Sequence, residues 1–272
     1  MYKLTKFIAA NDKDALNLIR EYMQVLVLKA IYRSKYGRGL SFMGGTCLRI
    51  CHDLKRFSED LDFTLDRPIP NYSFAELNKN IVTFLRSTEF DADCTVSEGK
   101  TVQKSYIKIS KVLNFFGVSQ LKAQKLQIKL EIDTKPVPVN DSDVETFFVT
   151  KFDEIFPILK HTDRTLFAGK ICALLNRKYT KGRDFYDLIW YLARKTDMNI
   201  NYVNKALRQS GAAQQFKNRS EVMAALKIRV ARISGEEILK DIGRFLEDPT
   251  EKQWLRNYGA VFKKLADAYI KV

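Results

Sequence analysis

The sequence has 272 residues, enough to bury a sizeable core in one large or two modest domains. Its 46 lysine and arginine residues outnumber 32 aspartate and glutamate residues, and the formal charge of +14 favours polyanionic partners, unless it merely reflects the composition of the source proteome. The chain has two histidines, and its four cysteines form no Cys-x-x-Cys pair, which argues against a zinc site. The scarcity of histidine also argues against a serine or cysteine hydrolase. The cysteines are therefore expected to be reduced thiols in the core.

The sequence shows neither the apolar run of an export signal nor that of a membrane-spanning segment. Residues 1–6 lack the apolar run of a signal peptide, and no apolar run approaches membrane-spanning length. We therefore expect a cytoplasmic protein with no membrane partner.

The first part of the chain mixes helical and extended patterns. Residues 12–35 have the apolar spacing of an amphipathic helix, with Gly37 after its end, and residues 73–86 predict a second helix. Strands are predicted over 40–43, 58–65, 90–96, 105–116 and 125–133, and Pro136 and Pro138 close this part.

Helical spacing dominates the rest of the chain, over 163–178, 184–194, 199–208, 220–232, 235–247 and 251–270. The sequence thus predicts an α+β fold: a catalytic domain of residues 1–160 with a mixed sheet flanked by helices, followed by a helical bundle of residues 161–272.

The segment 42–63, FMGGTCLRICHDLKRFSEDLDF, contains a turn and a pair of acids that together indicate a phosphate site. Gly44 and Gly45 follow an apolar run and precede a short helix predicted to begin at Thr46. Glycines at such a place let backbone N–H groups approach a phosphate closely.

Asp60 and Asp62 lie two residues apart on a predicted strand, so both carboxylates project from one face. Two like charges about 5 Å apart repel by roughly 3 kcal/mol at an effective dielectric near 20. Mg²⁺ prefers hard oxygen ligands of this kind. Taken alone, the pair would more ordinarily be two surface aspartates, and the upstream glycines favour the metal site.

A third carboxylate, Asp133, ends the strictly alternating segment 125–133. If this segment and the strand of Asp60 and Asp62 are neighbours in one sheet, the three carboxylates meet on one face and could hold one or two divalent ions. The opposite face would then be core, formed by Leu61, Phe63, Ile128, Leu130 and Ile132.

Two predicted helices of the second half carry further candidates. Lys170 suits a nucleotide phosphate as a compact charge, or is an ordinary surface lysine. Asp184 and Asp187 share one helix face, where a pair of acids also complements the helix dipole, and Asp184 could cap the helix. Arg183 could pair with Asp187 or contact phosphate.

These motifs, GGT, EDLDF, LEID, TLFAGK and RDFYDL, occur in an order that resembles the AbiEii/AbiGii-type nucleotidyltransferase toxins of the DNA polymerase β-like superfamily. The resemblance runs from about Phe42 to Leu192, over half of the chain. It implies a Mg²⁺-dependent nucleotidyltransferase with an NTP as substrate and one or two ions. It also implies a toxin of an abortive-infection type toxin–antitoxin system, which inhibits growth and has a cognate antitoxin as partner.

The resemblance implies roles for individual residues. Catalytic roles fall to Asp60, Asp62, Asp133, Lys170 and Asp184, and the metal ligands are Asp60, Asp62 and Asp133. Nucleotide binding falls to Gly44, Gly45, Thr46, Lys170 and Asp187.

The acceptor implied by the resemblance is RNA, such as tRNA. Candidate phosphate contacts in the helical half are Arg177, Lys178, Lys181, Arg194, Lys195, Lys205, Arg208, Lys227, Arg229 and Arg232, which could equally be solvated helix faces. Two alternatives stay open: transfer to a small molecule or a protein, and a catalytically silent nucleotide- or RNA-binding module. The intact acids and Lys170 argue against the silent module.

Overall fold

The structure is a computed structural model that describes residues 14–99, 101–177, 179 and 181–271. The chain forms two compact units. The first comprises Met1–Asp53, Phe57–Pro136 and Glu145–Lys160, and the second comprises Leu54–Arg56, Val137–Val144 and His161–Val272. The predicted assignment of residues 1–160 and 161–272 as separate domains stays a prediction.

Among the described residues of the first unit, seven strands form one mixed sheet in the order β3-β4-β5-β2-β1-β7-β6. The strands are β1 (Leu40–Met43), β2 (Asp60–Leu65), β3 (Ala92–Glu98), β4 (Val102–Ile109), β5 (Leu126–Asp133), β6 (Val144–Lys151) and β7 (Glu154–His161). The predicted α+β class with a mixed sheet is confirmed.

Strand β2 lies at the centre of this sheet, antiparallel to β1 and parallel to β5. Its odd-numbered residues Leu61 and Phe63 are buried, and the alternating residues Ile128, Leu130 and Ile132 of β5 are buried as well. The predicted core face is thus confirmed, and it leaves the opposite face of both strands to polar side chains.

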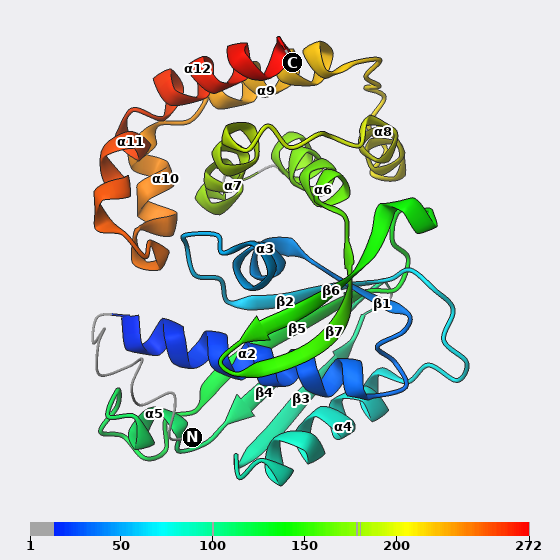
Figure 1. Ribbon diagram of the computed structural model, residues 1–272, viewed down its shortest axis with the longest axis vertical. Coiled ribbons are helices and arrows are strands. Elements are labelled where there is room, and N and C mark those ends of the chain that lie inside the picture. Colours follow the sequence, from blue (N-terminus) through cyan, green and yellow to red (C-terminus); the bar gives the residue numbers. More distant parts are fainter. Residues whose placement is uncertain (1–13, 100, 178, 180, 272) are drawn as a thin grey trace. The chain divides into compact units, whose positions relative to one another are not determined.

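Helices α2 (Ala15–Arg33) and α4 (Phe74–Ser87) cover one face of the sheet (Figure 1). Tyr32 of α2 contacts Phe63 of β2, with ring centroids 6.4 Å apart, so this is the apolar face. The Ser73 side chain caps α4 by accepting a hydrogen bond from the Glu76 N–H. Both helices were predicted, and the expected start of the first at residues 12 and 13 lies outside the described residues.

Some elements differ from the prediction. Helix α3 (Gly44–His52) begins at Gly44 rather than Thr46. The strand predicted over 105–116 ends at Ile109 and is followed by the short helix α5 (Val112–Phe115). Strands β6 and β7 were not expected from the sequence.

The second unit is helical, as predicted for this part of the chain. Its helices are α6 (Asp163–Asn176), α7 (Gly182–Ala193), α8 (Ile200–Gln209), α9 (Arg219–Val230), α10 (Gly235–Ile242), α11 (Lys252–Arg256) and α12 (Tyr258–Ile270), with the short 3₁₀ segments η2 (Asp141–Asp143), η3 (Gly243–Phe245) and η4 (Pro249–Glu251). The helix expected over 251–270 is therefore broken between α11 and α12.

Aromatic contacts hold these helices together. Phe167 of α6 stacks on Tyr191 of α7 with centroids 4.5 Å apart, and the Tyr258 hydroxyl donates to the Phe185 carbonyl at 2.9 Å.

Within the described part of the chain, no helix has the length and apolar character needed to cross a membrane. The four cysteines are free thiols; Cys47 and Cys172 are buried, whereas Cys51 and Cys94 are half-buried.

Candidate active site

Asp60 and Asp62 occupy alternate positions of β2, on the face opposite its buried apolar residues. Both carboxylates are half-buried, whereas Leu61 and Phe63 between and after them are buried. The predicted geometry of two carboxylates on one strand face is present.

Gly44 brings the start of α3 against Asp62. Its φ of +81° lies in the left-handed region, and a Cβ at this position would lie 2.4 Å from Oδ2 of Asp62. Only glycine satisfies both conditions without a shift of the carboxylate. The first backbone N–H groups of α3, from Gly44, Gly45 and Thr46, therefore begin beside an acidic side chain, at the positive end of a helix.

The side chain of Thr46 links α3 to β2. It is fully buried, and its hydroxyl donates to the carbonyl oxygen of Asp60. Because the hydroxyl is used inside the fold, the group that Thr46 can offer to a phosphate is its backbone N–H.

Buried polar contacts from α2 fix both elements further. The Gln24 amide donates to the carbonyls of Ser58 and Glu59, at 3.0 and 2.8 Å, just before β2. Glu21 accepts from Arg49 of α3 and from Lys151, each at 2.9 Å. These contacts hold the turn and the acidic strand in one arrangement, which a metal or phosphate site requires.

The sheet register places Glu131, rather than Asp133, beside Asp62. Asp62 pairs with Glu131, and Asp133 pairs with Thr64, one alternation further along β5. Among the described residues, no group of three or more acid, histidine or cysteine side chains lies close enough to hold a metal ion. The expected meeting of Asp60, Asp62 and Asp133 is therefore not formed among the described residues, because the register sets Asp133 one alternation beyond Asp62.

Two lysines surround the carboxylate of Glu131. Lys104 and Lys129 lie 3.0 and 2.8 Å from its oxygens. Burial would lower the pKa of Lys129, but the hydrogen bond with Glu131 and the charge of Asp60 raise it above its ordinary value. Lys129, which pairs with Asp60 in the sheet, thus supplies positive charge next to the acidic pair.

The donor set fits one hard divalent cation. Two carboxylates on one strand face supply oxygen ligands, and Mg²⁺ commonly takes one or two carboxylates and completes its shell with water and phosphate oxygens. The left-handed Gly44 beside Asp62 leaves space there that any Cβ would fill.

The candidates of the second unit form a buried ion-pair cluster. Lys170 of α6 lies 2.9 Å from Asp184 and 2.8 Å from Asp187, both on α7. The Arg56 guanidinium donates two hydrogen bonds to Asp187, at 2.8 and 2.7 Å, and Arg177 pairs with Asp184. The Arg56 and Asp187 side chains are 1% and 0% exposed, so this pair is withdrawn from water.

Within this cluster, neighbouring charges offset the effect of burial on the pKa of Asp187 and of Lys170. Burial alone would raise the pKa of Asp187, but the neighbouring Arg56 and Lys170 outweigh burial and keep the pKa below its ordinary value. Burial would likewise lower the pKa of Lys170, and Asp187 and Asp184 raise it above its ordinary value instead. A buried pair of this kind costs several kcal/mol per ion in lost hydration, which close partners must offset.

Two details of α7 differ from expectation. Its N-cap is Lys181, and Asp184 is a buried residue of the first turn rather than the cap. The guanidinium that holds Asp187 comes from Arg56, which is distant in sequence and was not predicted. Arg183 instead lies over the ring of Phe245, 5.2 Å from its centroid.

Sequence reasoning thus missed Arg56, Lys129 and Glu131. The signal for Glu131 was present, because it shares the polar face of its strand with Asp133. Nothing in the spacing of Arg56 pointed to Asp187.

Of the basic residues proposed as phosphate contacts, Lys178 lies outside the described residues, and Arg229 donates to the carbonyls of Leu174 and Arg177, both at 3.0 Å.

The chain is similar to known proteins in sequence and in fold. Residues 26–270 match the sequence model of a family described as nucleotidyl transferase AbiEii toxin, type IV toxin–antitoxin system. Among solved structures, JHP933 from Helicobacter pylori is similar at a TM-score of 0.56 and 16% identity, covering 94% of each chain. A Helicobacter pylori protein described as a candidate nucleotidyltransferase is similar at the same TM-score and identity, covering 93% of this chain and 95% of that one. These likenesses show the fold. No curated protein matches the chain.

Proposed function

Because this chain belongs to the AbiEii nucleotidyltransferase toxin family of type IV toxin–antitoxin systems, we propose that it transfers a nucleoside monophosphate from an NTP to an RNA acceptor such as tRNA, with Mg²⁺ as cofactor. The observation that carries this proposal is the half-buried pair Asp60 and Asp62 on one face of β2, with the left-handed Gly44 packed against Asp62.

The proposal gives each candidate site residue of the first unit a definite role. Asp60 and Asp62 hold the cation, which when bound neutralises charge on the triphosphate and on the leaving pyrophosphate. The backbone N–H groups at Gly44, Gly45 and Thr46 bind phosphate oxygens at the start of α3. Reaction then consists of attack by an acceptor hydroxyl on the α-phosphorus, with departure of pyrophosphate, so positioning and charge neutralisation supply most of the catalysis.

Asp133 is proposed to accept the proton of the attacking hydroxyl, as the family resemblance implies. Glu131 competes for this role, because it is the residue that pairs with Asp62. The variants Asp133→Asn and Glu131→Gln separate them: the one that performs the role loses transfer activity, and the other retains most of it.

Lys170, Asp184 and Asp187 are proposed to take part in nucleotide binding and catalysis on the strength of the family resemblance. Their contacts within the second unit also support a structural part, since Lys170 lies between both acids. Lys170→Met distinguishes the two parts. Loss of transfer at an unchanged melting temperature supports the catalytic part, whereas loss of both supports the structural one.

The RNA acceptor is supported by the net charge of +14, since phosphate contacts dominate nucleic-acid affinity. An antitoxin partner accords with the family.

The test is incubation of the purified protein with Mg²⁺, each α-³²P-labelled NTP in turn and total cellular RNA, with wild type and Asp60→Ala compared on a denaturing gel. We expect label in a tRNA-sized band with wild type alone. Label in protein or in a small molecule would replace the RNA acceptor by one of these. No label and no NTP binding by calorimetry would favour a silent module.

A further inference from the structure

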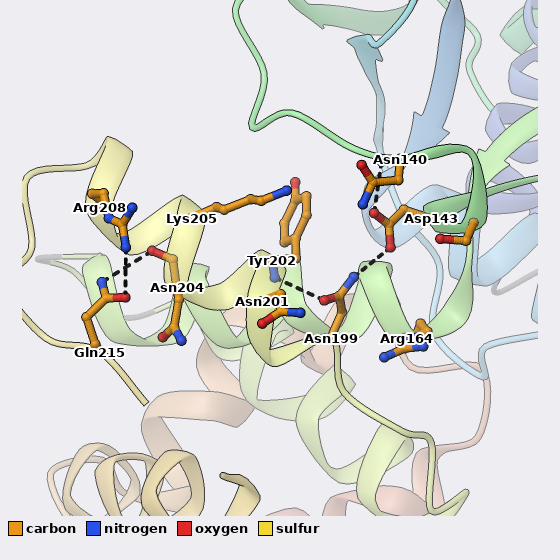
Figure 2. Close-up of a pocket in the computed structure, with 11 residues that line it drawn as sticks. Asn140, Asp143, Arg164, Asn199, Asn201, Tyr202, Asn204, Lys205, Arg208 and Gln215 are labelled. Atoms are coloured by element: carbon orange, nitrogen blue, oxygen red, sulfur yellow. Dashed lines mark hydrogen bonds between the residues drawn. The ribbon is translucent and has the colours of Figure 1, made fainter. Parts of the chain in front are cut away.

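The second unit contains a polar pocket apart from the ion-pair cluster of Lys170. Its volume is about 460 Å³, and η2, the start of α6, α8 and the segment after α8 form its walls. Figure 2 shows Arg208 and Gln215 at one end and Arg164 at the other, with the side chains of α8 between them. A space of this size suits one small-molecule unit, yet its lining is polar where ligand pockets are usually apolar.

A buried hydrogen-bond network makes the walls rigid. Asp143 of η2 accepts from the Asn199 amide at 2.7 Å and from the Asn140 N–H at 3.0 Å. Asn199 in turn caps α8 by accepting from the Tyr202 N–H at 3.0 Å. Asn204 both donates to and accepts from the backbone of Phe216, at 2.8 and 2.9 Å. These amides are committed to the fold, so the pocket is preorganised.

A second set of side chains presents its polar ends at the pocket. Asn201, Lys205 and Arg208 lie on α8 at helical spacing, so they form one stripe about 10 Å long. All three are exposed. Val203 and Leu207 are buried on the other side of the helix, which keeps the stripe turned outward.

The charge of the pocket selects an anion. Of the residues that line it in the described structure, Asp143 is the one acid, and its carboxylate is occupied by the hydrogen bonds of the wall. Arg164, Lys205 and Arg208 are the basic lining residues. Most of the remaining lining is amide that is committed to the wall, and the exposed amide of Asn201 can donate to phosphate oxygens and bond ribose hydroxyls.

We propose that this pocket binds the sugar–phosphate backbone of an RNA strand, with Lys205 and Arg208 on phosphates and Asn201 on a phosphate or a ribose hydroxyl. The inference rests on the proposed RNA acceptor and places part of its binding surface. Base stacking on proteins normally uses an exposed aromatic ring, and the aromatic lining residue here, Tyr202, is 7% exposed. The contact therefore reads the backbone rather than the base sequence.

The experiment measures the affinity of the full-length protein for fluorescent single-stranded RNA without NTP, across a salt series. The double variant Lys205→Ala, Arg208→Ala is compared with Lys240→Ala, Lys252→Ala, which removes two exposed charges of α10 and α11 away from the pocket. We expect the pocket variant to bind about 10-fold more weakly than its control, with a salt slope smaller by about 1.4, since each single-strand phosphate contact adds about 0.7.

Three further readouts sharpen the result. Asn201→Ala should weaken binding without changing the salt slope. The pocket variant should lose the same factor of affinity for RNAs of scrambled sequence as for the original RNA. Photo-crosslinks from 4-thiouridine RNA should fall within residues 199–215. Circular dichroism and melting temperature confirm that each variant is folded.

Equal binding by the pocket variant and its control, with wild type binding RNA, would overturn the inference and leave the proposed function standing. Failure of wild type to bind RNA would remove the acceptor of the proposed function as well. Tight binding of free nucleoside monophosphate, undiminished by competing RNA, would also overturn the inference.

Discussion

The acids of β2 and the acids of α7 are both close pairs of aspartates, yet they lie in opposite surroundings. Asp60 and Asp62 are half-buried on a strand face, with the backbone of Gly44 against one of them. Asp184 and Asp187 are buried on a helix and held by Lys170, Arg177 and Arg56. An acid that water and a ligand can reach can hold a cation, whereas a buried acid held by fixed cations contributes to the stability of the fold whether or not it also takes part in catalysis.

Removing the charge of Asp62 gives the largest expected effect on activity. We expect Asp62→Asn to lower nucleotidyl transfer by about 10³-fold, because the loss of a metal ligand removes several kcal/mol of transition-state stabilisation. The free energy of unfolding should change by less than about 1 kcal/mol. Transfer assays and urea denaturation measure both, with the exposed Asp91→Asn as control. Retained transfer by Asp62→Asn would contradict the metal role.

Removing Asp187 should act mainly on stability. Asp187→Ala leaves Arg56 buried without its carboxylate, which typically costs about 3–5 kcal/mol. Urea denaturation measures the loss. The double variant Arg56→Met, Asp187→Leu should recover most of it, because apolar residues of similar volume need no hydration. A single variant as stable as wild type would show that the cluster contributes little.

Gly44 allows a matched test of the space beside Asp62. Gly44→Ala should lower the free energy of unfolding by about 1–3 kcal/mol and reduce transfer, since the added Cβ displaces the carboxylate. Gly117→Ala is the control, because Gly117 has a φ of +72° but no atom within 4 Å of an added Cβ. It should carry the backbone cost alone and keep full activity. Equal activity of the two variants would argue against the close approach.

The smallest expected effect is a pH dependence of the stability that the buried cluster provides. The pKa of Asp187 is lower in the folded state, so its stabilisation is present above the unfolded pKa near 3.9 and is lost as pH falls through the folded pKa. The stability difference between wild type and Asp187→Asn should therefore shrink below about pH 4. Urea midpoints between pH 3 and 7 measure it, and a constant difference would refute the assignment.

The sequence predicted the parts of the fold that depend on local pattern. Strands β2 and β5 alternate strictly, and most helices have clear apolar spacing, so their existence followed. The hairpin of β6 and β7 was missed because its turn consists of Phe152 and Asp153, both with positive φ, where Asn-Gly is the usual signal. Pro157 within β7 also weakened the strand pattern.

The candidate site was predictable as far as its residues share one element. Asp60, Asp62 and Gly44 could be read together because strand alternation and a turn fix them locally. The position of Asp133 depended on the register between β2 and β5, which two similar alternating strands leave undetermined. The pairing of Arg56 with Asp187 depended on a tertiary contact without a sequence signature.

That pairing also bears on how the protein can be cut into fragments. The helical unit takes Leu54–Arg56 and Val137–Val144 from the earlier chain. A C-terminal fragment starting at His161 would therefore lack Arg56, the guanidinium partner of Asp187, as well as Asp143, the acid in the wall of the polar pocket. On the ribosome, by contrast, both segments emerge before His161, so they are already available when the helices follow.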